Sequence, residues 1–316
     1  MTIPAGLPRS ILIRDVGPRD GLQPEEPVAV ADRIRLVERL VAAGVARIEV
    51  AAFVSPKAVP ALAGAAEVVA GVGRPDGVVR AALVPNARGA ELALEAAVDE
   101  VTVTISASEA YNERNVKMSI AESLGVVADI VELAERPMVA GTGLATPVDA
   151  VVSCAFGSPY EGEIAPTEVA DLCARLLEAG VDAVTLADTT GMATPRRIHE
   201  VLGALAGVSL TAADIGLHLH DTRGTALVNA YAALERGVAR FDTSVGGLGG
   251  SPFAHGAGGN LATESLVAMC DDLGIATGIR VEGLVEAAAL VEELVGRPVP
   301  SGVAHHGPRT RRASTS

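Results

Sequence analysis

Two histidines, His218 and His220, stand two residues apart in the segment IGLHLHDTRG. If this segment is a strand, its period of two places both imidazoles on one face and Leu217 and Leu219 on the other. A pair of imidazoles on one face favours a metal site over two hydrogen-bonded core histidines, because neutral imidazole is a common metal ligand. Imidazole alone fits zinc, iron and harder ions, so the remaining ligands decide the metal.

Two further residues offer oxygen to such a site. Asp20, in VGPRDG, supplies a hard carboxylate, and Asn260, in GAGGN, supplies a neutral carbonyl oxygen. Two oxygen ligands beside two imidazoles favour an octahedral Mg²⁺ or Mn²⁺ site with two open positions. The predicted metal ligands are therefore Asp20, His218, His220 and Asn260.

Two more charged residues are candidates for contact with a substrate. Arg19 precedes Asp20, and a guanidinium stays charged and donates hydrogen bonds in a fixed fork, which suits a negatively charged substrate; a surface salt bridge is the alternative. Asp188, in LADTTG, offers a carboxylate for substrate binding, and a helix N-cap is an equally good interpretation.

A sequence segment that predicts a helix end, a turn and a strand occurs four times. Its copies are LVAAGVARIEV, LEAAVDEVTV, LEAGVDAVTL and LERGVARFDT, and Gly44, Gly180 and Gly237 suit left-handed helix C-caps. Aligning the copies puts Glu49, Thr102, Thr185 and Asp242 at one equivalent position. Polar residues there, where a filled barrel carries Val or Ile, indicate a site, and we assign Thr185 to substrate binding; the alternative is that the threonines are simply good strand formers.

The strands that carry these residues predict a (β/α)8 TIM barrel. Eight strands are expected to start near residues 11, 47, 79, 100, 150, 183, 215 and 240, about one every 33 residues, the length of one βα unit. An open doubly wound sheet is the alternative, but its first turn would be glycine-rich, whereas VGPRDG is charged. Strands one, seven and eight are neighbours in a closed barrel, so their carboxyl ends bring the predicted ligands together.

The predicted domain organisation has three parts. Residues 1–280 form the catalytic barrel, residues 281–300 a C-terminal helix packed on it, and residues 301–316 a flexible tail in which His305 and His306 face solvent. The glycine-rich loop Gly246–Asn260 is expected to be a lid over the site.

Composition limits the partners and the compartment. The net charge of −14 repels nucleic acid and anionic lipid, and the absence of a long apolar run argues against a membrane protein. Three cysteines without a CxxC pair argue against a disulfide framework and favour the cytoplasm.

From about Ile11 to Ile275 the chain resembles the 3-hydroxy-3-methylglutaryl-CoA lyases, metal-dependent TIM-barrel enzymes. The motifs that carry this resemblance are VGPRDGLQ, IEVAAFVSPK, ASEAYNERN, VSCAFGSPYEG, LADTTGMATP, HLHDTRGTALVNA and GLGGSPFAHGAGGNLATESL. The resemblance assigns metal binding to the same four predicted ligands. It assigns catalytic roles to Arg19 and Glu49 and implies a homo-oligomer, a dimer or higher.

Two segments depart from the family pattern. The family's glycine loop reads GLGGCP with a catalytic cysteine, whereas this chain has Ser251, a much weaker acid than a thiol. The segment 136–150 is longer and less similar than usual, so the substrate could differ.

The implied reaction is cleavage of 3-hydroxy-3-methylglutaryl-CoA to acetyl-CoA and acetoacetate. We expect Arg19 to stabilise negative charge on the thioester oxygen, Glu49 or His218 to carry a proton, and Ser251 to occupy the position of the catalytic cysteine. The alternatives are a lyase for a related 3-hydroxyacyl-CoA, such as citramalyl-CoA or a longer-chain glutaryl-CoA, a barrel that catalyses the reverse condensation, and a non-catalytic acyl-CoA binder.

Overall fold

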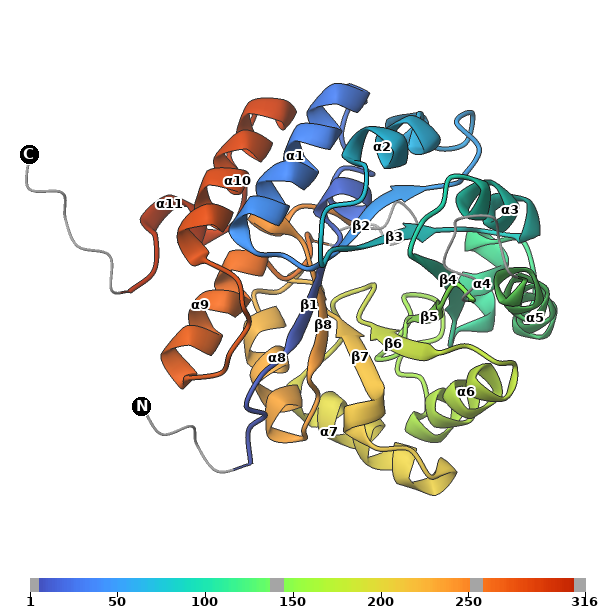
Figure 1. The fold of residues 1–316 in the computed structure, drawn as a ribbon. Helices are drawn as coiled ribbons and strands as arrows, with labels where there is room; N and C mark the ends of the chain where they lie inside the picture. Colours follow the sequence, from blue (N-terminus) through green and yellow to red (C-terminus); the bar gives the residue numbers. More distant parts are fainter. Residues whose placement is uncertain (1–5, 137–144, 251–257, 310–316) are drawn as a thin grey trace, which may run out of the picture.

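The protein folds into a closed barrel of eight parallel strands surrounded by helices (Figure 1). The structure, a computed structural model, describes residues 6–136, 145–250 and 258–309. The strands pair in chain order, and β8 closes the barrel by pairing with β1. The predicted TIM barrel is therefore confirmed.

The strands are short and mostly buried. They are β1 (Leu12–Asp15), β2 (Arg47–Ala52), β3 (Val79–Leu83), β4 (Glu100–Ser106), β5 (Val148–Ser153), β6 (Ala183–Ala187), β7 (Ile215–His218) and β8 (Arg240–Thr243). Strand five begins two residues before the predicted start, and β7 ends at His218. His220 instead forms an isolated antiparallel bridge with Asn260, so the chain after β8 pairs with the chain after β7.

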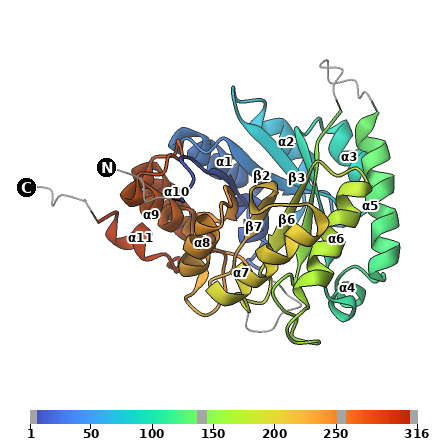
Figure 2. The same ribbon diagram turned by 90° about the horizontal axis from the view of Figure 1, so that it is seen from below.

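The helices form the outer layer, and α6, α7, α8 and α9 follow one another around the barrel (Figure 2). Their bounds are α1 (Val30–Ala43), α2 (Ala65–Val72), α3 (Ala87–Glu95), α4 (Glu109–Asn115), α5 (Ile120–Glu135), α6 (Pro166–Glu178), α7 (Pro195–Ala204), α8 (Ala226–Glu235), α9 (Thr263–Leu273), α10 (Val281–Val295) and α11 (Gly302–His306). Among the described residues, no helix is long and apolar enough to cross a membrane.

In the repeated segment, the helices end at glycines in the left-handed conformation, as predicted. Gly44, Gly180 and Gly237 have positive φ values of 100°, 95° and 92°. Ala97, at the equivalent position of the second copy, adopts a φ of 58° without the freedom of glycine. At Gly44 a side chain would also collide with the chain, because a Cβ atom would lie 2.6 Å from the carbonyl oxygen of Gly278.

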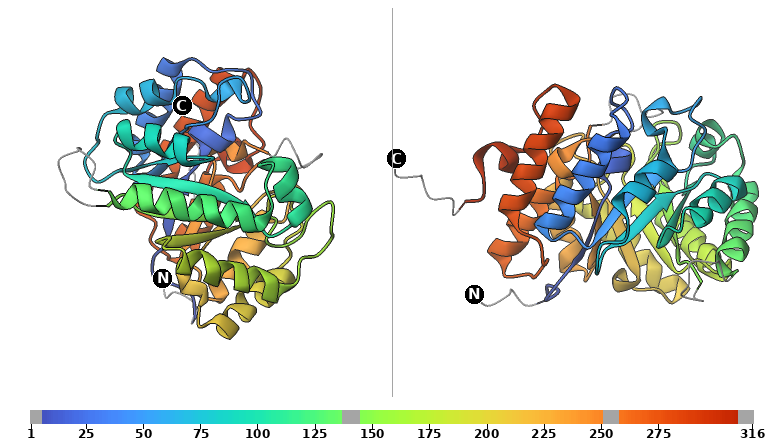
Figure 3. Two further views of the ribbon diagram at one scale, coloured as in Figure 1. Left: turned by 90° about the vertical axis from the view of Figure 1, so that its right-hand side faces the viewer. Right: turned by 45° about the horizontal axis from the view of Figure 1, so that its top comes forward.

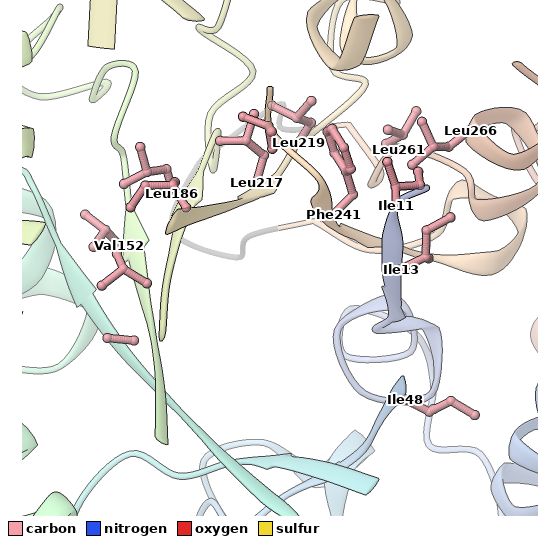
Figure 4. Packing of buried hydrophobic residues seen from close by; sticks show 14 of the residues in the cluster. Ile11, Ile13, Ile48, Val152, Leu186, Leu217, Leu219, Phe241, Leu261 and Leu266 are labelled. Carbon is pink, nitrogen blue, oxygen red and sulfur yellow. The ribbon is translucent and has the colours of Figure 1, made fainter. Parts of the chain in front are cut away.

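One hydrophobic core joins the strands to the helices. Figure 4 shows Ile11 and Ile13 on the side of Leu261 and Leu266, and Leu217 near Phe241. These side chains are almost fully buried. The apolar face of each strand thus packs outward on helices, which leaves the opposite face for the polar residues described below.

The helix α10 occupies a place in the outer layer beside α1 (Figure 3, right). Gly283 allows this close approach, since a Cβ atom there would lie 2.8 Å from the Cβ of Ala43. Residues 301–309, predicted to be tail, contain the helix α11, which packs on α9 and α10. The oxygen of Ser301 accepts a hydrogen bond from the Ala304 amide, and His305 and His306 are exposed as expected.

Candidate metal centre and active site

Arg19 and Asp20 lie on a short π-helical turn, Gly17–Gly21, which directly follows β1. The turn closes because the amides of Asp20 and Gly21 both donate to the carbonyl of Val16, at 2.7 and 3.1 Å. Its first amide, from Gly17, donates to the Asp15 carboxylate at 2.8 Å. Both functional side chains therefore stand at the carboxyl end of a barrel strand, where the active sites of this fold are built.

The two histidines face each other at the carboxyl end of β7. Their Nε2 atoms lie 3.2 Å apart, which confirms the shared face predicted from their spacing. The other ring nitrogens have separate partners: Nδ1 of His220 lies 3.0 Å from the carbonyl oxygen of Gly258, and Nδ1 of His218 lies 3.4 Å from the Asp242 carboxylate. Each ring therefore has a polar partner at Nδ1, the nitrogen that points away from the other histidine.

Asn260 contacts Asp20, the other predicted oxygen ligand, beside the two histidines. Its Nδ2 donates to Asp20 Oδ2 at 2.8 Å and to the carbonyl of Leu248 at 2.8 Å. Its Oδ1 is buried and has no hydrogen-bond partner among the described residues. An orphaned buried carbonyl is costly unless something else satisfies it, and a cation does so.

The donor set fits a divalent metal ion. Ligand atoms of Asp20, His218 and His220 all lie within 4.8 Å of one another. With the free oxygen of Asn260, they offer two imidazole nitrogens, a carboxylate oxygen and an amide oxygen. This mixture of hard oxygen and imidazole donors suits a metal such as Mg²⁺ or Mn²⁺ better than the thiolate-rich sites of structural zinc.

The electrostatics keep the donor atoms of Asp20 and His220 available. Burial tends to raise the pKa of Asp20, but Arg19 and the two histidines outweigh it and hold that pKa below its usual value. Burial, together with the neighbouring His218, lowers the pKa of His220 to about 4. Near neutral pH Asp20 is therefore an anion and His220 a neutral imidazole, the protonation states that bind metal.

Arg19 bridges the ligands and Glu49. Its Nε donates to Glu49, and its Nη1 donates to Asp20 at 2.7 Å. Glu49 accepts a second hydrogen bond, from the Thr102 hydroxyl. The pairing register between β2 and β3 shifts between Glu49 and Ala51. Arg19 and Glu49 are 8% and 1% exposed, which identifies a desolvated ion pair beside the candidate ligands rather than a surface salt bridge.

Asp188 lies just past β6 and is 1% exposed. Its Oδ1 accepts a hydrogen bond from the Ala193 amide at 2.8 Å, whereas Oδ2 is buried without a partner among the described residues. Burial raises the pKa of this carboxyl to about 7. Thr194, not Asp188, caps α7, so the alternative N-cap interpretation of Asp188 is wrong.

Thr185 points into the barrel interior, where its hydroxyl donates to Asp149 at 3.0 Å. Asp242, the equivalent residue of β8, also lies inside and accepts hydrogen bonds from Arg14. Glu49 and Thr102 bond to each other. The four equivalent residues therefore share the inward orientation predicted from the repeat, but they divide between two groups, one containing Arg19 and one containing Arg14.

Comparison with known proteins identifies the family. The model of the HMGL-like family matches residues 10–291, which is most of the chain. The chain belongs to the HMGL-like family. The resemblance predicted from the motifs is thereby confirmed.

Curated relatives in the HMGL-like family are similar over nearly their whole length. A hydroxymethylglutaryl-CoA lyase of Bacillus subtilis is 43% identical over 93% of this chain and 96% of its own. A Pseudomonas aeruginosa protein named 3-hydroxy-3-isohexenylglutaryl-CoA/hydroxy-methylglutaryl-CoA lyase is 43% identical over 92% and 95%.

Solved structures of HMGL-like proteins superpose closely on the barrel. A hydroxymethylglutaryl-CoA lyase from Pseudomonas aeruginosa has a TM-score of 0.90 and 42% identity, and covers 95% of this chain and 98% of its own. An HMG-CoA lyase from Acinetobacter baumannii, solved with coenzyme A and 3-methylmalate, has a TM-score of 0.89 and 38% identity, with full coverage of both chains.

Ser251, where the chain departs from the HMGL-like pattern, lies outside the described residues, as do 137–144 of the unusual segment 136–150. The described ends of the glycine-rich loop border the ligands. Gly249 has a φ of 112°, and a Cβ atom on it would lie 2.3 Å from Nδ2 of Asn260. Glycine is therefore required where the loop leaves the candidate metal centre.

The residue that sequence reasoning missed in this HMGL-like barrel is Arg14. It lies within β1, where its guanidinium contacts Glu100, Asp149 and Asp242 in the barrel interior. A signal was present, because Arg14 interrupts the apolar strand segment ILIRD and Asp149 directly precedes another predicted strand. Charged residues at buried strand positions require partners, and these two are partners of each other.

Proposed function

We propose that this protein cleaves 3-hydroxy-3-methylglutaryl-CoA to acetyl-CoA and acetoacetate in a metal-dependent reaction. The observation that carries the proposal is the meeting of Asp20, His218, His220 and Asn260 beside the buried pair Arg19 and Glu49. The oxygen of Asn260 has no partner among the residues that the structure describes. The relatives named hydroxymethylglutaryl-CoA lyase support the same substrate.

The four candidate ligands would hold the cofactor, which we propose to be Mg²⁺ or Mn²⁺. When bound, such an ion polarises substrate oxygens and lowers the pKa of a hydroxyl group. The chain's own contribution is orientation: Asn260 fixes Asp20, and Gly258 fixes His220. Preorganised ligands do not have to be rearranged as the reaction proceeds.

The carbon–carbon bond breaks when a base takes the proton of the tertiary hydroxyl group. The hydroxyl oxygen becomes the ketone of acetoacetate, and the bonding electrons move to the acetyl thioester as an enolate. Glu49 and His218 are the proposed proton carriers, since both are buried, Glu49 within β2 and His218 at the carboxyl end of β7. Arg19 donates to the enolate oxygen, for which its fork of N–H groups is already oriented by Glu49 and Asp20.

The enolate must then receive a proton to leave as acetyl-CoA. We propose that Ser251 stands where the family supplies this proton from a cysteine. Asp188 is the proposed contact for a polar group of the substrate, supported by its buried Oδ2, which has no partner within residues 6–136, 145–250 and 258–309. Thr185 stays a predicted substrate contact, although its hydroxyl donates to Asp149 in the structure.

The direct test is product formation by the purified protein. With Mg²⁺ or Mn²⁺ we expect equal amounts of acetyl-CoA and acetoacetate, and with a chelator none. Binding of the CoA thioester without cleavage would instead identify a non-catalytic acyl-CoA binder.

A related substrate is the second candidate, because one relative is named for a 3-isohexenyl as well as a 3-methyl substrate. Both thioesters, and citramalyl-CoA, should be compared at equal concentration by their kcat/KM. We further propose that the protein acts as a homo-oligomer, dimer or higher, in the cytoplasm. Sedimentation of the purified protein tests the first of these and fractionation of cells the second.

A further inference from the structure

The interior of the barrel beneath the candidate metal centre contains a buried arginine with three carboxylates. Arg14 donates from Nε and Nη2 to the two oxygens of Asp242, at 2.9 and 2.8 Å. Its Nη1 donates to Glu100 at 2.9 Å, and its Nη2 also lies 2.7 Å from Asp149. The guanidinium is thereby held from three strands, β4, β5 and β8, in addition to its own.

This cluster is shielded from water. Arg14, Glu100, Asp149 and Asp242 are 4% to 6% exposed. The interior of a TIM barrel is normally filled by layers of branched apolar side chains. A buried ion cluster is weak evidence for stability, since apolar residues of similar volume often stabilise a core as well or better. The cluster therefore calls for a role beyond holding the barrel together.

One of the carboxylates reaches the metal centre. Oδ2 of Asp242 lies 3.4 Å from Nδ1 of His218, whose Nε2 faces His220 at 3.2 Å. In metal sites the second ring nitrogen of a ligating histidine commonly donates to a carboxylate, which fixes the tautomer and the orientation of the ring. Asp242 stands in that position with respect to His218.

We infer that Arg14 and Asp242 form a positioning pair that orients His218 for metal binding. This inference rests on the proposed metal-dependent function. Arg14 fixes the plane of the Asp242 carboxylate through two parallel hydrogen bonds, and Asp242 in turn fixes the imidazole. Glu100 and Asp149 hold the guanidinium, so the polar interior of the barrel becomes part of the support of the active site.

The structure supplies a matched control for this inference. Asp149 is as buried as Asp242 and contacts the same Nη2 atom of Arg14, at 2.7 Å compared with 2.8 Å. Its side-chain partners among the described residues are Arg14 and Thr185. Asp242→Asn and Asp149→Asn therefore each remove one buried charge from the same cluster, but only the former changes the contact to His218.

The test measures Mn²⁺ affinity of the metal-stripped full-length protein by electron paramagnetic resonance. We expect Asp242→Asn and Arg14→Met to weaken Mn²⁺ binding about 10- to 100-fold, the usual effect of losing the partner of a ligating histidine. Asp149→Asn should weaken it less than about threefold. Raising Mn²⁺ should restore most of the kcat of Asp242→Asn, which general damage to the barrel would not allow.

A double-mutant cycle tests whether Arg14 acts through Asp242. If it does, the double variant that combines Arg14→Met with Asp242→Asn should have the same Mn²⁺ affinity as the single variant that binds Mn²⁺ more weakly. Arg14→Lys keeps the charge but not the two parallel bonds, so it remains informative if Arg14→Met does not fold. The Mn²⁺ affinity of Arg14→Lys should lie between those of the wild type and Arg14→Met.

Two results would overturn the inference: wild-type Mn²⁺ affinity in folded Asp242→Asn, or equal losses in Asp242→Asn and Asp149→Asn. Fully additive losses in the cycle would also reject the link between Arg14 and Asp242. Failure of the proposed function looks different, because the wild-type protein itself would then neither bind Mn²⁺ nor cleave the thioester.

Discussion

The amide of Asn260 donates a hydrogen bond of 2.8 Å to the carboxylate of Asp20, 240 residues away in the sequence. Closure of the barrel makes this contact possible, because β1 and β8 are paired neighbours. The bond uses the amide nitrogen, and the Asn260 oxygen has no hydrogen-bond partner in the described parts of the chain. Asp20 and Asn260 thus orient each other with one ligand atom of Asn260 left free.

Replacing His220 should weaken metal binding most directly. His220→Ala removes one of the two imidazole donors, and we expect at least a tenfold weaker Mn²⁺ affinity, since loss of a ligand exceeds loss of a ligand's partner. His199→Ala, on the exposed face of α7, is the control. Titration calorimetry measures both, and unchanged affinity in His220→Ala would remove this residue from the site.

Arg19→Met should lower turnover more than it changes KM. Arg19 is expected to act on charge that develops as the bond breaks, and loss of one such donor typically lowers kcat about 10²- to 10³-fold. Arg88→Met, on the exposed surface of α3, should have wild-type kinetics. If steady-state rates showed a rise in KM alone, Arg19 would be an anchor for the bound substrate instead.

Ser251→Cys should raise turnover if this position delivers a proton, because a thiol titrates much nearer neutral pH than a hydroxyl. Ser251→Ala is the matched variant that removes the hydroxyl. Rates as a function of pH at saturating Mg²⁺ compare the three proteins. A cysteine variant no faster than an efficient wild type would mean that another group supplies the proton here, and would favour a different acyl-CoA substrate.

Ionisation of Asp15 should lower the free energy of unfolding as pH rises from about 4 to about 7, against an opposite contribution from His220, whose pKa is lowered to about 4 by burial. Burial raises the pKa of Asp15 to about 7, and hydrogen bonds from Thr263 and Gly17 offset only part of that effect. A carboxyl whose pKa is raised on folding stabilises the protein while it is protonated in the folded state, and this stabilisation is lost as pH rises through its folded pKa. Asp188 contributes in the same direction.

Asp15→Asn isolates this effect. Its unfolding free energy should depend less on pH than that of the wild type, by up to about 1.4 kcal/mol per pH unit in this interval. Urea denaturation at pH 5 and pH 7.5 measures the difference, and Asp171→Asn, an exposed carboxylate on α6, is the control. Equal pH dependence in wild type and Asp15→Asn would show that Asp15 ionises normally.

The pairing partners inside the barrel could not be read from the sequence. The inward orientation of Glu49, Thr102, Thr185 and Asp242 followed from their place in the repeat, but their partners depend on which strands face each other across the interior. The sequence therefore predicted a substrate contact for Thr185, whereas its hydroxyl donates a hydrogen bond to Asp149 of β5. Arg14 was overlooked because one charged residue in a strand is informative only when its opposite partners are known.

The sequence by itself determined the barrel and its four candidate ligands. Local rules suffice for both: glycine caps end the helices, buried strands recur about every 33 residues, and a period of two puts His218 and His220 on one face. Only the tertiary structure decided that Arg14 and Asp242 support His218 from below. Such contacts join strands distant in the chain at separations of a few ångströms, and they are set by how the closed barrel packs its interior rather than by local sequence.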